Sequence, residues 1–459
     1  MIAFLILPFV AVLVLYLNLR KVADGSRGVL MAGLPIILTF GSFFLARQNS
    51  AFFSWIQCIM VIWLCQALWM FLLWDLVCVV RWIVRRAKRK KGHIQYKTDF
   101  VRNGVRAVLA ITILLTFWLL AYGIPNNDDY KTRTLDVPVT VYESSAESRD
   151  FKAVFFSDLH IDPIFQKEKL ERLIAQCDSI KPSFILFGGD LADVHDAVLT
   201  EEGYDKLLQR LAATARIAAV AINGNHEAFM ERSGSDPEGF LRKNGWLVLD
   251  DSSACVPTAC FTGRRDYQKA RVFDEPRKSL KELAEAHPMA AQLIKDKHFV
   301  PWIIMDHQPK GVEEDLGEFR PDLALSGHTH DGQFFPGNIL INWIWPLAYG
   351  EGFLNDIHWL VSSGVDSWGP PVRAGSDTEI WVLNFKLKVV RLRLEQYILD
   401  SSPSAEFLAE VDSLNKEAMQ KIREEDRKRL QALIGGNARF SNTPEQKSEI
   451  AADSSTNDL

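Results

Sequence analysis

The sequence predicts two structural classes in one chain: a multi-span α-helical membrane domain followed by an α/β domain. Two observations support this prediction. The first 125 residues hold long apolar stretches, each near the length of roughly 20 residues that a helix needs to cross a bilayer. The second half holds five short apolar runs, each followed by polar residues. Stretches with helical periodicity lie between the first and second runs and between the second and third.

Four apolar stretches in residues 1–125 are predicted to span a membrane. Four such helices have no folded partner here that could cover them as a buried core. The first stretch lacks the basic flank and the small-residue cleavage site of a secretory signal, so we expect it to be retained. The stretches are Ile2–Leu19, Gly28–Ala46, Phe52–Val80 and Ala107–Ile124.

The distribution of basic residues predicts how these helices are oriented. Seven Lys and Arg residues lie between positions 81 and 91, three follow the first stretch, and one lies between the second and third stretches. Because short cytoplasmic loops are rich in Lys and Arg, the first and third loops are predicted to be cytoplasmic. Everything beyond Ile124 would then face the outside of the inner or plasma membrane. Binding of anionic lipid head groups is an alternative role for the basic cluster.

The second half of the chain reads as an α/β domain. Its continuous apolar runs suit strands that are buried on both faces of a sheet. Gln166–Ile180 and Tyr204–Ala215 lie between such runs and have apolar residues at helical spacing, so strands and helices alternate. The runs are Ala153–Phe156, Phe184–Phe187, Ile217–Ile222, Trp302–Met305 and Leu323–Leu325.

Each apolar run ends in a polar motif that offers ligands for a metal ion. Together the motifs supply seven candidates, which are Asp158, His160, Asp190, Asn225, His307, His328 and His330. Carboxylate, amide and imidazole donors without thiolate suit divalent first-row metals such as Mn, Fe or Zn. Structural zinc sites more often use closely spaced Cys. Seven ligands are too many for one tetrahedral ion but suit two divalent ions that share one carboxylate, an arrangement that supports hydrolysis at phosphorus.

The order Asp-Leu-His, Gly-Gly-Asp, Gly-Asn-His-Glu, His and Gly-His-Thr-His resembles the calcineurin-like metallophosphoesterase superfamily over roughly residues 151–387. The resemblance implies a sandwich of two sheets flanked by helices. The segment from Gly327 to Gln333 is also similar to the Gly-His-Thr-His-x-Gly-Gln motif of a membrane-associated or exported bacterial subfamily. Asp331 stands where that subfamily usually has Gly.

The resemblance also implies a role for each motif residue. The first metal would be bound by Asp158, His160 and His330. The second metal would be bound by Asn225, His307 and His328, and Asp190 would bridge the two ions. His226 resembles the histidine that is not a ligand but contacts the phosphate and helps to protonate the leaving group.

These roles imply a membrane-anchored dimetal phosphoesterase that hydrolyses a phosphodiester or phosphomonoester through a metal-bridging hydroxide. The membrane anchor favours a lipid or an envelope precursor as the substrate. Two alternatives are a membrane sensor or scaffold with a non-catalytic metal-binding domain, and a lipid-A-pathway diphosphate hydrolase, which would need a cytoplasmic site. The net charge of −5 argues against binding to nucleic acid.

The predicted boundaries divide the chain into five parts. A transmembrane domain (1–125) and a linker (126–150) precede the metallophosphoesterase domain (151–400), an amphipathic helix (401–436) and a disordered tail (437–459). Within the linker, Val137–Tyr142 would form a strand at the edge of the domain.

Several details stay open in the sequence. Cys255 and Cys260 are close enough in the chain for a disulfide, but geometry decides whether one forms. Trp343–Leu347 would face the membrane interface, wall an apolar groove or pack as a loop. Arg264, Arg265 and Arg373 are either phosphate contacts or structural and solvated charges.

Overall fold

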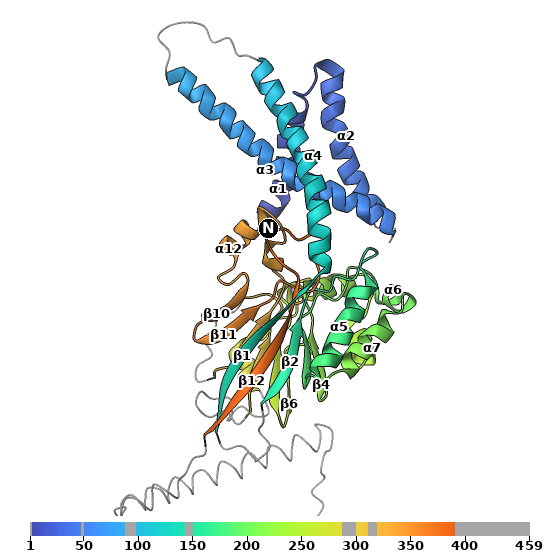
Figure 1. Cartoon of the computed structure of the whole chain (residues 1–459), viewed down its shortest axis with the longest axis vertical. Helices are drawn as coiled ribbons and strands as arrows, with labels where there is room; N and C mark the ends of the chain where they lie inside the picture. The colour runs from blue at the N-terminus through green and yellow to red at the C-terminus, as the bar shows by residue number, and fades with distance from the viewer. Residues whose placement is uncertain are drawn as a thin grey trace, which may run out of the picture. The chain divides into compact units, whose positions relative to one another are not determined.

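A computed structural model describes residues 2–46, 50–87, 98–142, 150–286, 300–310 and 319–390 of the chain. Four helices come first, and a domain of two sheets and several helices follows (Figure 1). The basic residues 88–91, the predicted helix 401–436 and the predicted tail 437–459 lie outside the described residues.

The four N-terminal helices follow the four predicted stretches. They are α1 (Ile2–Leu19), α2 (Gly25–Ala46), α3 (Ala51–Ala87) and α4 (Thr98–Asp128). Among the described residues, three segments are long and apolar enough to cross a membrane, and these are Gly25–Leu45, Ala51–Ala87 and Asp99–Asp128. The side chains of the first half of α1 lie outside the description, so its span stays a prediction. Apolar side chains from all four helices, including Leu15, Ala32, Phe71 and Val105, form one buried cluster.

The rest of the described chain forms an α/β sandwich, as the resemblance implied. Its first sheet contains β1 (Lys131–Tyr142), β12 (Glu379–Val390), β2 (Phe151–Phe156), β3 (Phe184–Phe187), β4 (Ala218–Ile222) and β5 (Leu247–Leu249), in that order. The second contains β10 (Gly350–Leu354), β11 (Ile357–Val361), β9 (Leu323–Ser326), β8 (Trp302–Met305), β7 (Ala259–Gly263) and β6 (Ser252–Val256). The helices of this domain are α5 (Lys167–Ile180), α6 (Asp196–Glu201), α7 (Tyr204–Ala213), α8 (Asn225–Arg232), α9 (Pro237–Lys243), α10 (Tyr267–Phe273), α11 (Leu280–Glu285) and α12 (Gly337–Ile344).

Burial on both faces explains why the strands are continuous apolar runs. In β2, Ala153 and Phe155 point into the core between the two sheets, whereas Val154 and Phe156 point to the layer formed by α5 and α7. Successive side chains of a strand point to opposite faces, so each face must be apolar. The outer face of the second sheet packs on α11 through residues such as Trp302 and Leu280.

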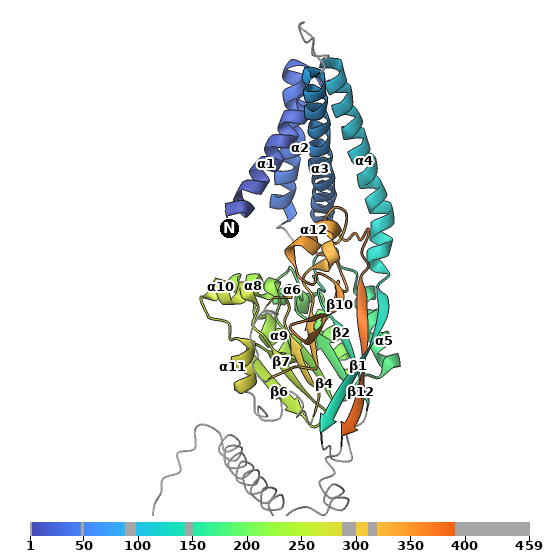
Figure 2. The same cartoon turned by 90° about the vertical axis from the view of Figure 1, so that its left-hand side faces the viewer.

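Strand β1 connects the membrane helices to the sandwich. The predicted edge strand Val137–Tyr142 is present and begins earlier, at Lys131, three residues after α4 ends at Asp128. β1 pairs in parallel with β12 over twelve residues, and β12 runs antiparallel to β2. The chain therefore enters the sandwich at the edge of its first sheet, directly from α4 (Figure 2).

Candidate metal centre

All five predicted motifs follow the carboxyl ends of strands. Ser157 follows β2, Gly188 follows β3, Asn223 follows β4, Asp306 follows β8 and Gly327 follows β9. Neighbouring parallel strands bring their carboxyl ends to the same edge of a sheet, which is where sites form in α/β folds. Strands β2, β3 and β4 are parallel neighbours in one sheet, and β8 and β9 are parallel neighbours in the other.

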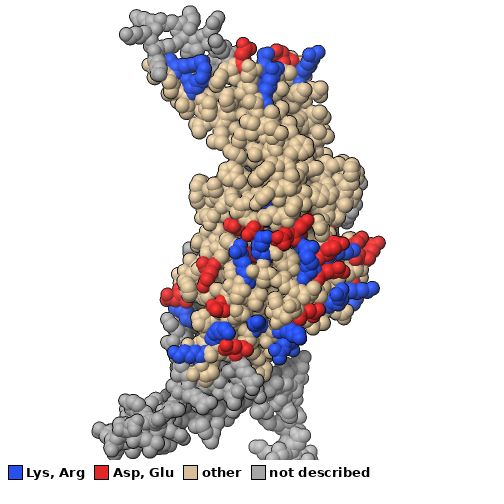
Figure 3. Space-filling model, in the orientation of Figure 1, with Lys and Arg blue, Asp and Glu red and all other residues tan. Residues whose placement is uncertain are grey.

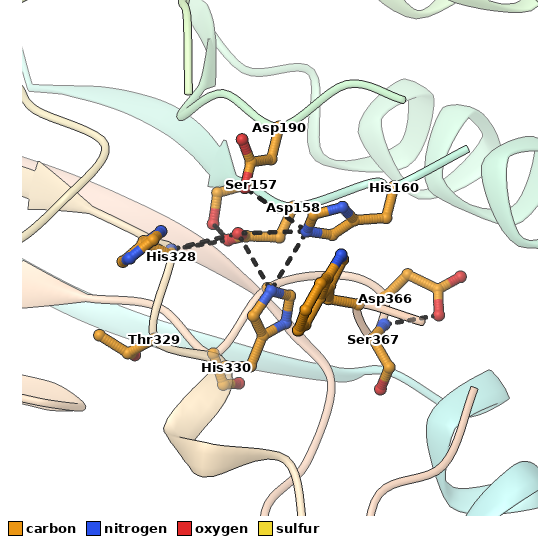
Figure 4. A network of polar contacts seen from close by, with 12 residues as sticks. Ser157, Asp158, His160, Asp190, His328, Thr329, His330, Asp366 and Ser367 are labelled. Atoms are coloured by element: carbon orange, nitrogen blue, oxygen red, sulfur yellow. Dashed lines mark hydrogen bonds and ion pairs between the residues drawn. The ribbon is translucent and has the colours of Figure 1, made fainter. Parts of the chain in front are cut away.

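The first group of converging donors consists of Asp158, His160 and His330. The Nε2 atoms of His160 and His330 are 3.2 Å apart, and each faces Oδ1 of Asp158, at 3.8 and 3.5 Å respectively. Figure 4 shows these three side chains pointing toward one another, two from the segment after β2 and His330 from the segment after β9. All three are buried, so their donor atoms face one another with little water between them.

The second group consists of Asp190, His307 and His328. Nε2 of His307 lies 3.0 Å from Oδ2 of Asp190. The other ring nitrogen of His307, Nδ1, is 2.8 Å from the carbonyl oxygen of Gly188. A carbonyl only accepts hydrogen bonds, so Nδ1 carries a proton, and in the neutral ring the lone pair is on Nε2, which faces the site.

Asp190 lies between the two groups. Its Oδ2 is 3.0 Å from His307 and 3.5 Å from Nε2 of His160, which belongs to the first group. Its Oδ1 accepts a hydrogen bond from the backbone N–H of His226 at 2.9 Å. One carboxylate oxygen thus faces both sets of donors, which is the position that a ligand shared by two ions requires.

Asn225 is the seventh predicted ligand. It is the first residue of α8 and follows Gly224, where an added Cβ would come within 2.2 Å of Oδ1 of Asp190. Only glycine therefore allows this close approach, which brings the start of α8 against the site. The buried Oδ1 of Asn225 has no hydrogen-bond partner among the described residues.

The donor set fits divalent cations. Buried polar atoms normally have partners, yet Oδ1 of Asn225 has no hydrogen-bond partner in the described part of the chain. Burial disfavours the charged form of His307, but the carboxylate of Asp190 outweighs it and raises the pKa of His307 to about 10. Burial and the neighbouring His307 lower the pKa of His328 to about 4. The site therefore favours positive charge beside Asp190. A divalent cation bound there would supply that charge in place of the proton on His307, and His328 is already neutral, as a ligand must be.

The backbone at the predicted ligands is strained. Five of the seven have positive φ angles, and these are Asp158 (58°), His160 (44°), Asp190 (61°), His328 (71°) and His330 (52°). Residues other than glycine seldom adopt this left-handed region, at a cost on the order of 1 kcal/mol or more each. Such outliers gather at functional sites, because the surrounding structure holds side chains where the function needs them.

Glu227 links the segment after β3 to the segment after β4 through backbone hydrogen bonds. Its buried carboxylate accepts hydrogen bonds from the backbone N–H groups of Gly224 at 2.7 Å, Leu191 at 2.6 Å and Asp190 at 3.2 Å. Burial, together with the nearby Asp190, raises the pKa of Glu227 to about 7. The last residue of the Gly-Asn-His-Glu motif thus joins the segments that follow β3 and β4.

His226 lies beside the first group but contacts a residue that the sequence analysis missed. Its Nδ1 contacts Oδ1 of Asp193, which is also 3.5 Å from Nδ1 of His160. Burial opposes protonation of His226, but the carboxylates of Asp190 and Asp193 raise its pKa. The sequence signal for Asp193 was its position three residues after Asp190, on the same loop.

Three arginines that were open in the sequence have structural partners. Arg373 is fully buried and donates to the carbonyl oxygens of His330 (2.6 Å), Ser363 (2.7 Å) and Asp366 (2.7 Å). Arg264 is buried against Asp306, and Arg265 pairs with Asp250 and Glu275. These arginines support the loops around the site.

Asp331 has an environment of its own. It adopts a positive φ of 48° in the 3-10 turn His330–Gly332 (η2) and belongs to none of the donor groups found in the described residues. Burial raises its pKa to about 6, an effect that Arg373 opposes and Glu379 reinforces. The charged groups that act on Asp331 therefore include Arg373 and Glu379.

The chain is similar to known proteins and to one family model. The family model described as calcineurin-like phosphoesterase matches residues 151–332. The chain is similar to a "Transmembrane protein with metallophosphoesterase domain" of Danio rerio (27% identical, 61% of this chain and 63% of the relative). A protein of the same name from Bos taurus is 26% identical over 64% of this chain and 65% of its own length. An "Uncharacterized metallophosphoesterase" of Helicobacter pylori is 26% identical over 50% and 59%. The match thus spans about three fifths of each relative's own length.

Proposed function

We propose that this chain, whose residues 151–332 place it in the calcineurin-like metallophosphoesterase superfamily, is a membrane-anchored, metal-dependent hydrolase of phosphoric esters. The observation that carries the proposal is the position of Asp190, with one carboxylate oxygen facing donors of both groups. Apolar helices long enough to span a membrane precede the domain and provide the anchor.

Each predicted ligand has a role in the proposal. Asp158, His160 and His330 hold one divalent ion, and Asn225, His307 and His328 hold a second. Asp190 is shared. Two ions bound in this way would lower the pKa of a water molecule between them and offset negative charge on the phosphoryl oxygens. The carboxylates and neutral imidazoles of the set suit Mn, Fe or Zn.

His226 acts on the leaving group. Its Nδ1 is bound by Asp193, so Nε2 is the nitrogen that can give a proton to the departing oxygen. The raised pKa of His226 keeps this proton available near neutral pH. A loss of His226 should therefore affect esters with poor leaving groups most.

The substrate is a phosphodiester or a phosphomonoester, and the membrane anchor favours a lipid or envelope precursor. The proposed location is the cell membrane, crossed several times, with the site on the extracytoplasmic side. Two features support this side: the basic residues at the other end of α3, and the disulfide between Cys255 and Cys260 on the paired strands β6 and β7. Disulfides persist in oxidising compartments. This location disfavours the lipid-A-pathway alternative.

The test is metal analysis of the full chain in detergent, combined with hydrolysis of phosphomonoester and phosphodiester panels. Asp190→Asn should lose both bound metal and activity, whereas His226→Ala should retain metal and lose activity. His358→Ala is the matched control, since His358 lies on β11 and contacts Glu351 instead. Full metal loading without hydrolysis of any ester would reject the enzyme and favour the scaffold. A reporter fused after Leu459 and active only outside the cytoplasm tests the orientation.

A further inference from the structure

Helix α12 is an uncharged segment that lies in the chain between two residues at the candidate site, His330 and Trp345. It begins at Gly337, seven residues after the ligand His330, and ends at Ile344. The next residue, Trp345, returns to the site, where its buried ring lies 5.4 Å from the ring of His328. Both ends of α12 are thus fastened beside predicted metal ligands.

The outward face of α12 is apolar and exposed. None of its eight residues is buried, and none is charged. Trp343 and Ile344 are 80% and 68% exposed, and Ile339 and Leu340 lie one helical turn earlier on the same face. A helix of a soluble domain normally buries its apolar face. This face needs an apolar partner.

The membrane helices indicate which partner covers this face. The segment before α12 is attached to α3, because the side-chain amide nitrogen Nε2 of Gln66 donates a hydrogen bond to the carbonyl oxygen of Phe335 at 3.1 Å. The ring of Trp69 packs on the ring of Phe335, 5.0 Å between centroids. Phe334 packs against a cluster that also contains Leu119 of α4.

These contacts lie within the depth of a bilayer. Gln66 precedes Arg81 by 15 residues (81 − 66), which is about 22 Å of helix. Leu119 follows Arg106 by 13 residues (119 − 106), or about 20 Å. Arg81 packs on Phe100 of α4, so the basic ends of the two helices lie side by side. The hydrocarbon core is roughly 30 Å thick, and both contacts therefore lie inside it if the arginines mark one of its surfaces.

Other features of the same region agree with a lipid environment. Trp118 and Tyr122 of α4 are exposed and stacked on each other, as in the aromatic belts at membrane surfaces. The exposed rings of Phe229 and Trp368 flank His226, with centroids 5.8 and 6.0 Å from its ring. Figure 3 shows a broad belt with almost no charged side chains on the face drawn, between the charges at its two ends.

We propose that α12 inserts into the lipid leaflet on the domain's side of the membrane, and that the site takes the phosphate of a lipid in that leaflet. This inference rests on the proposed function and names its substrate class. In the reaction, water oxygen bonds to phosphorus, one P–O ester bond of the lipid breaks, and the leaving oxygen takes a proton. Insertion of α12 brings this phosphate to the side of the site that Trp345 and His328 form.

The position of α12 is tested without any activity measurement. A fluorophore is attached at Trp343→Cys in a full chain whose free Cys58, Cys65, Cys78 and Cys177 are replaced by Ala, and the protein is placed in lipid nanodiscs. Spin-labelled lipids should quench this fluorophore, and aqueous iodide should not. The control label at Leu247→Cys, the exposed first residue of β5, should show the reverse. Quenching by iodide alone, or energy transfer between two copies at position 343, would overturn the insertion.

The substrate class is tested with a matched pair of variants. Phosphatidic acid and phosphatidylglycerol in nanodiscs are compared with a soluble aryl phosphate. The double variant Trp343→Asp/Ile344→Asp should lower the ratio of lipid to aryl phosphate kcat/KM about tenfold, whereas Leu247→Asp should leave the ratio unchanged. An unchanged ratio in the double variant, or turnover of the aryl phosphate with no lipid turnover, rejects the lipid inference and leaves the proposed function standing. If the metal-loaded protein hydrolyses nothing, the proposed function fails, and the quenching result still decides the position of α12.

Discussion

Asp193 contacts His226 through Oδ1 and Nδ1, and this contact determines which nitrogen of His226 remains for the substrate. A carboxylate accepts only, so it selects the ring form with a proton on Nδ1 and stabilises the doubly protonated ring. The same carboxylate is 3.5 Å from Nδ1 of His160, so it orients a predicted ligand and the predicted acid together.

Replacing Asp193 with Asn should lower kcat for alkyl phosphoesters about 100-fold, because a positioned acid contributes at least that much. Esters of acidic phenols should lose much less, since their leaving group needs no proton. The bound metal should be retained, as measured by elemental analysis of the purified chain. Asp178→Asn, on the exposed face of α5, is the control. Equal losses for both kinds of ester would contradict the role of His226 as the acid.

Removing metal with a chelator should destabilise the protein. Asp158 and Asp190 are both buried, and a cation that binds only the folded state stabilises it by about 4 kcal/mol at roughly 1,000 times its Kd. The thermal unfolding midpoint in detergent should therefore fall on chelation and return when divalent metal is added. His307→Ala should show a smaller chelator effect, whereas His358→Ala should match the wild type. A thermal unfolding midpoint that does not change when the chelator is added would argue against a resident metal.

Arg373→Lys should destabilise the protein by about 3 kcal/mol or more. One Lys nitrogen cannot reach the several buried carbonyl oxygens that the guanidinium now satisfies, and each that is left unpaired costs about 1–3 kcal/mol. Urea unfolding of the full chain in detergent measures the change. Arg210→Lys, at an exposed position of α7, should have almost no effect. A stable Arg373→Lys variant that has lost only substrate affinity would instead indicate a phosphate contact.

Lys269 should contribute stability that depends on pH. Its Nζ lies 2.9 Å from Glu231 and 3.4 Å from Asp250, and it also contacts Glu238. Burial alone would raise the pKa of Glu238, but Lys269 outweighs this effect and lowers it. A carboxylate with a depressed pKa stabilises the fold above its unfolded pKa and loses that contribution as the pH falls through its folded pKa.

Lys269→Met should accordingly lower the unfolding midpoint strongly at pH 7, because three carboxylates would then face one another. The difference from the wild type should shrink as the pH is lowered below about 4, where the carboxylates take up protons. Lys206→Met on α7 is a control without such a cluster. A difference that is constant from pH 7 to pH 4 would show that Lys269 acts through packing alone.

The disulfide was undecided in the sequence and is present in the structure. Cys255 and Cys260 are directly opposite each other on β6 and β7, with their Cα atoms 4.1 Å apart. The sequence indicated the pair but did not decide whether the bond forms, because formation depends on the register of two strands. Strand register follows from packing of the sheet as a whole.

The sequence predicts the candidate metal centre as a set of residues but not its geometry. Buried strands must be apolar on both faces, so their ends are visible in the chain as the points where the polar motifs that contain Asp158, Asp190 and His307 begin. The positive φ angles at these motifs, and the contact of Asp193 with His226, arise from packing between loops that are distant in sequence.

The sequence by itself determined the two classes of domain, the strands and the identity of the donors, because local apolar patterns and short motifs encode them. Only the tertiary structure decided what contacts what: that Arg373 binds backbone carbonyls, that the charges of Arg373 and Glu379 act on Asp331, and that the segment before α12 is attached to α3. Such contacts join residues far apart in the chain, and only the packing of whole elements brings them together.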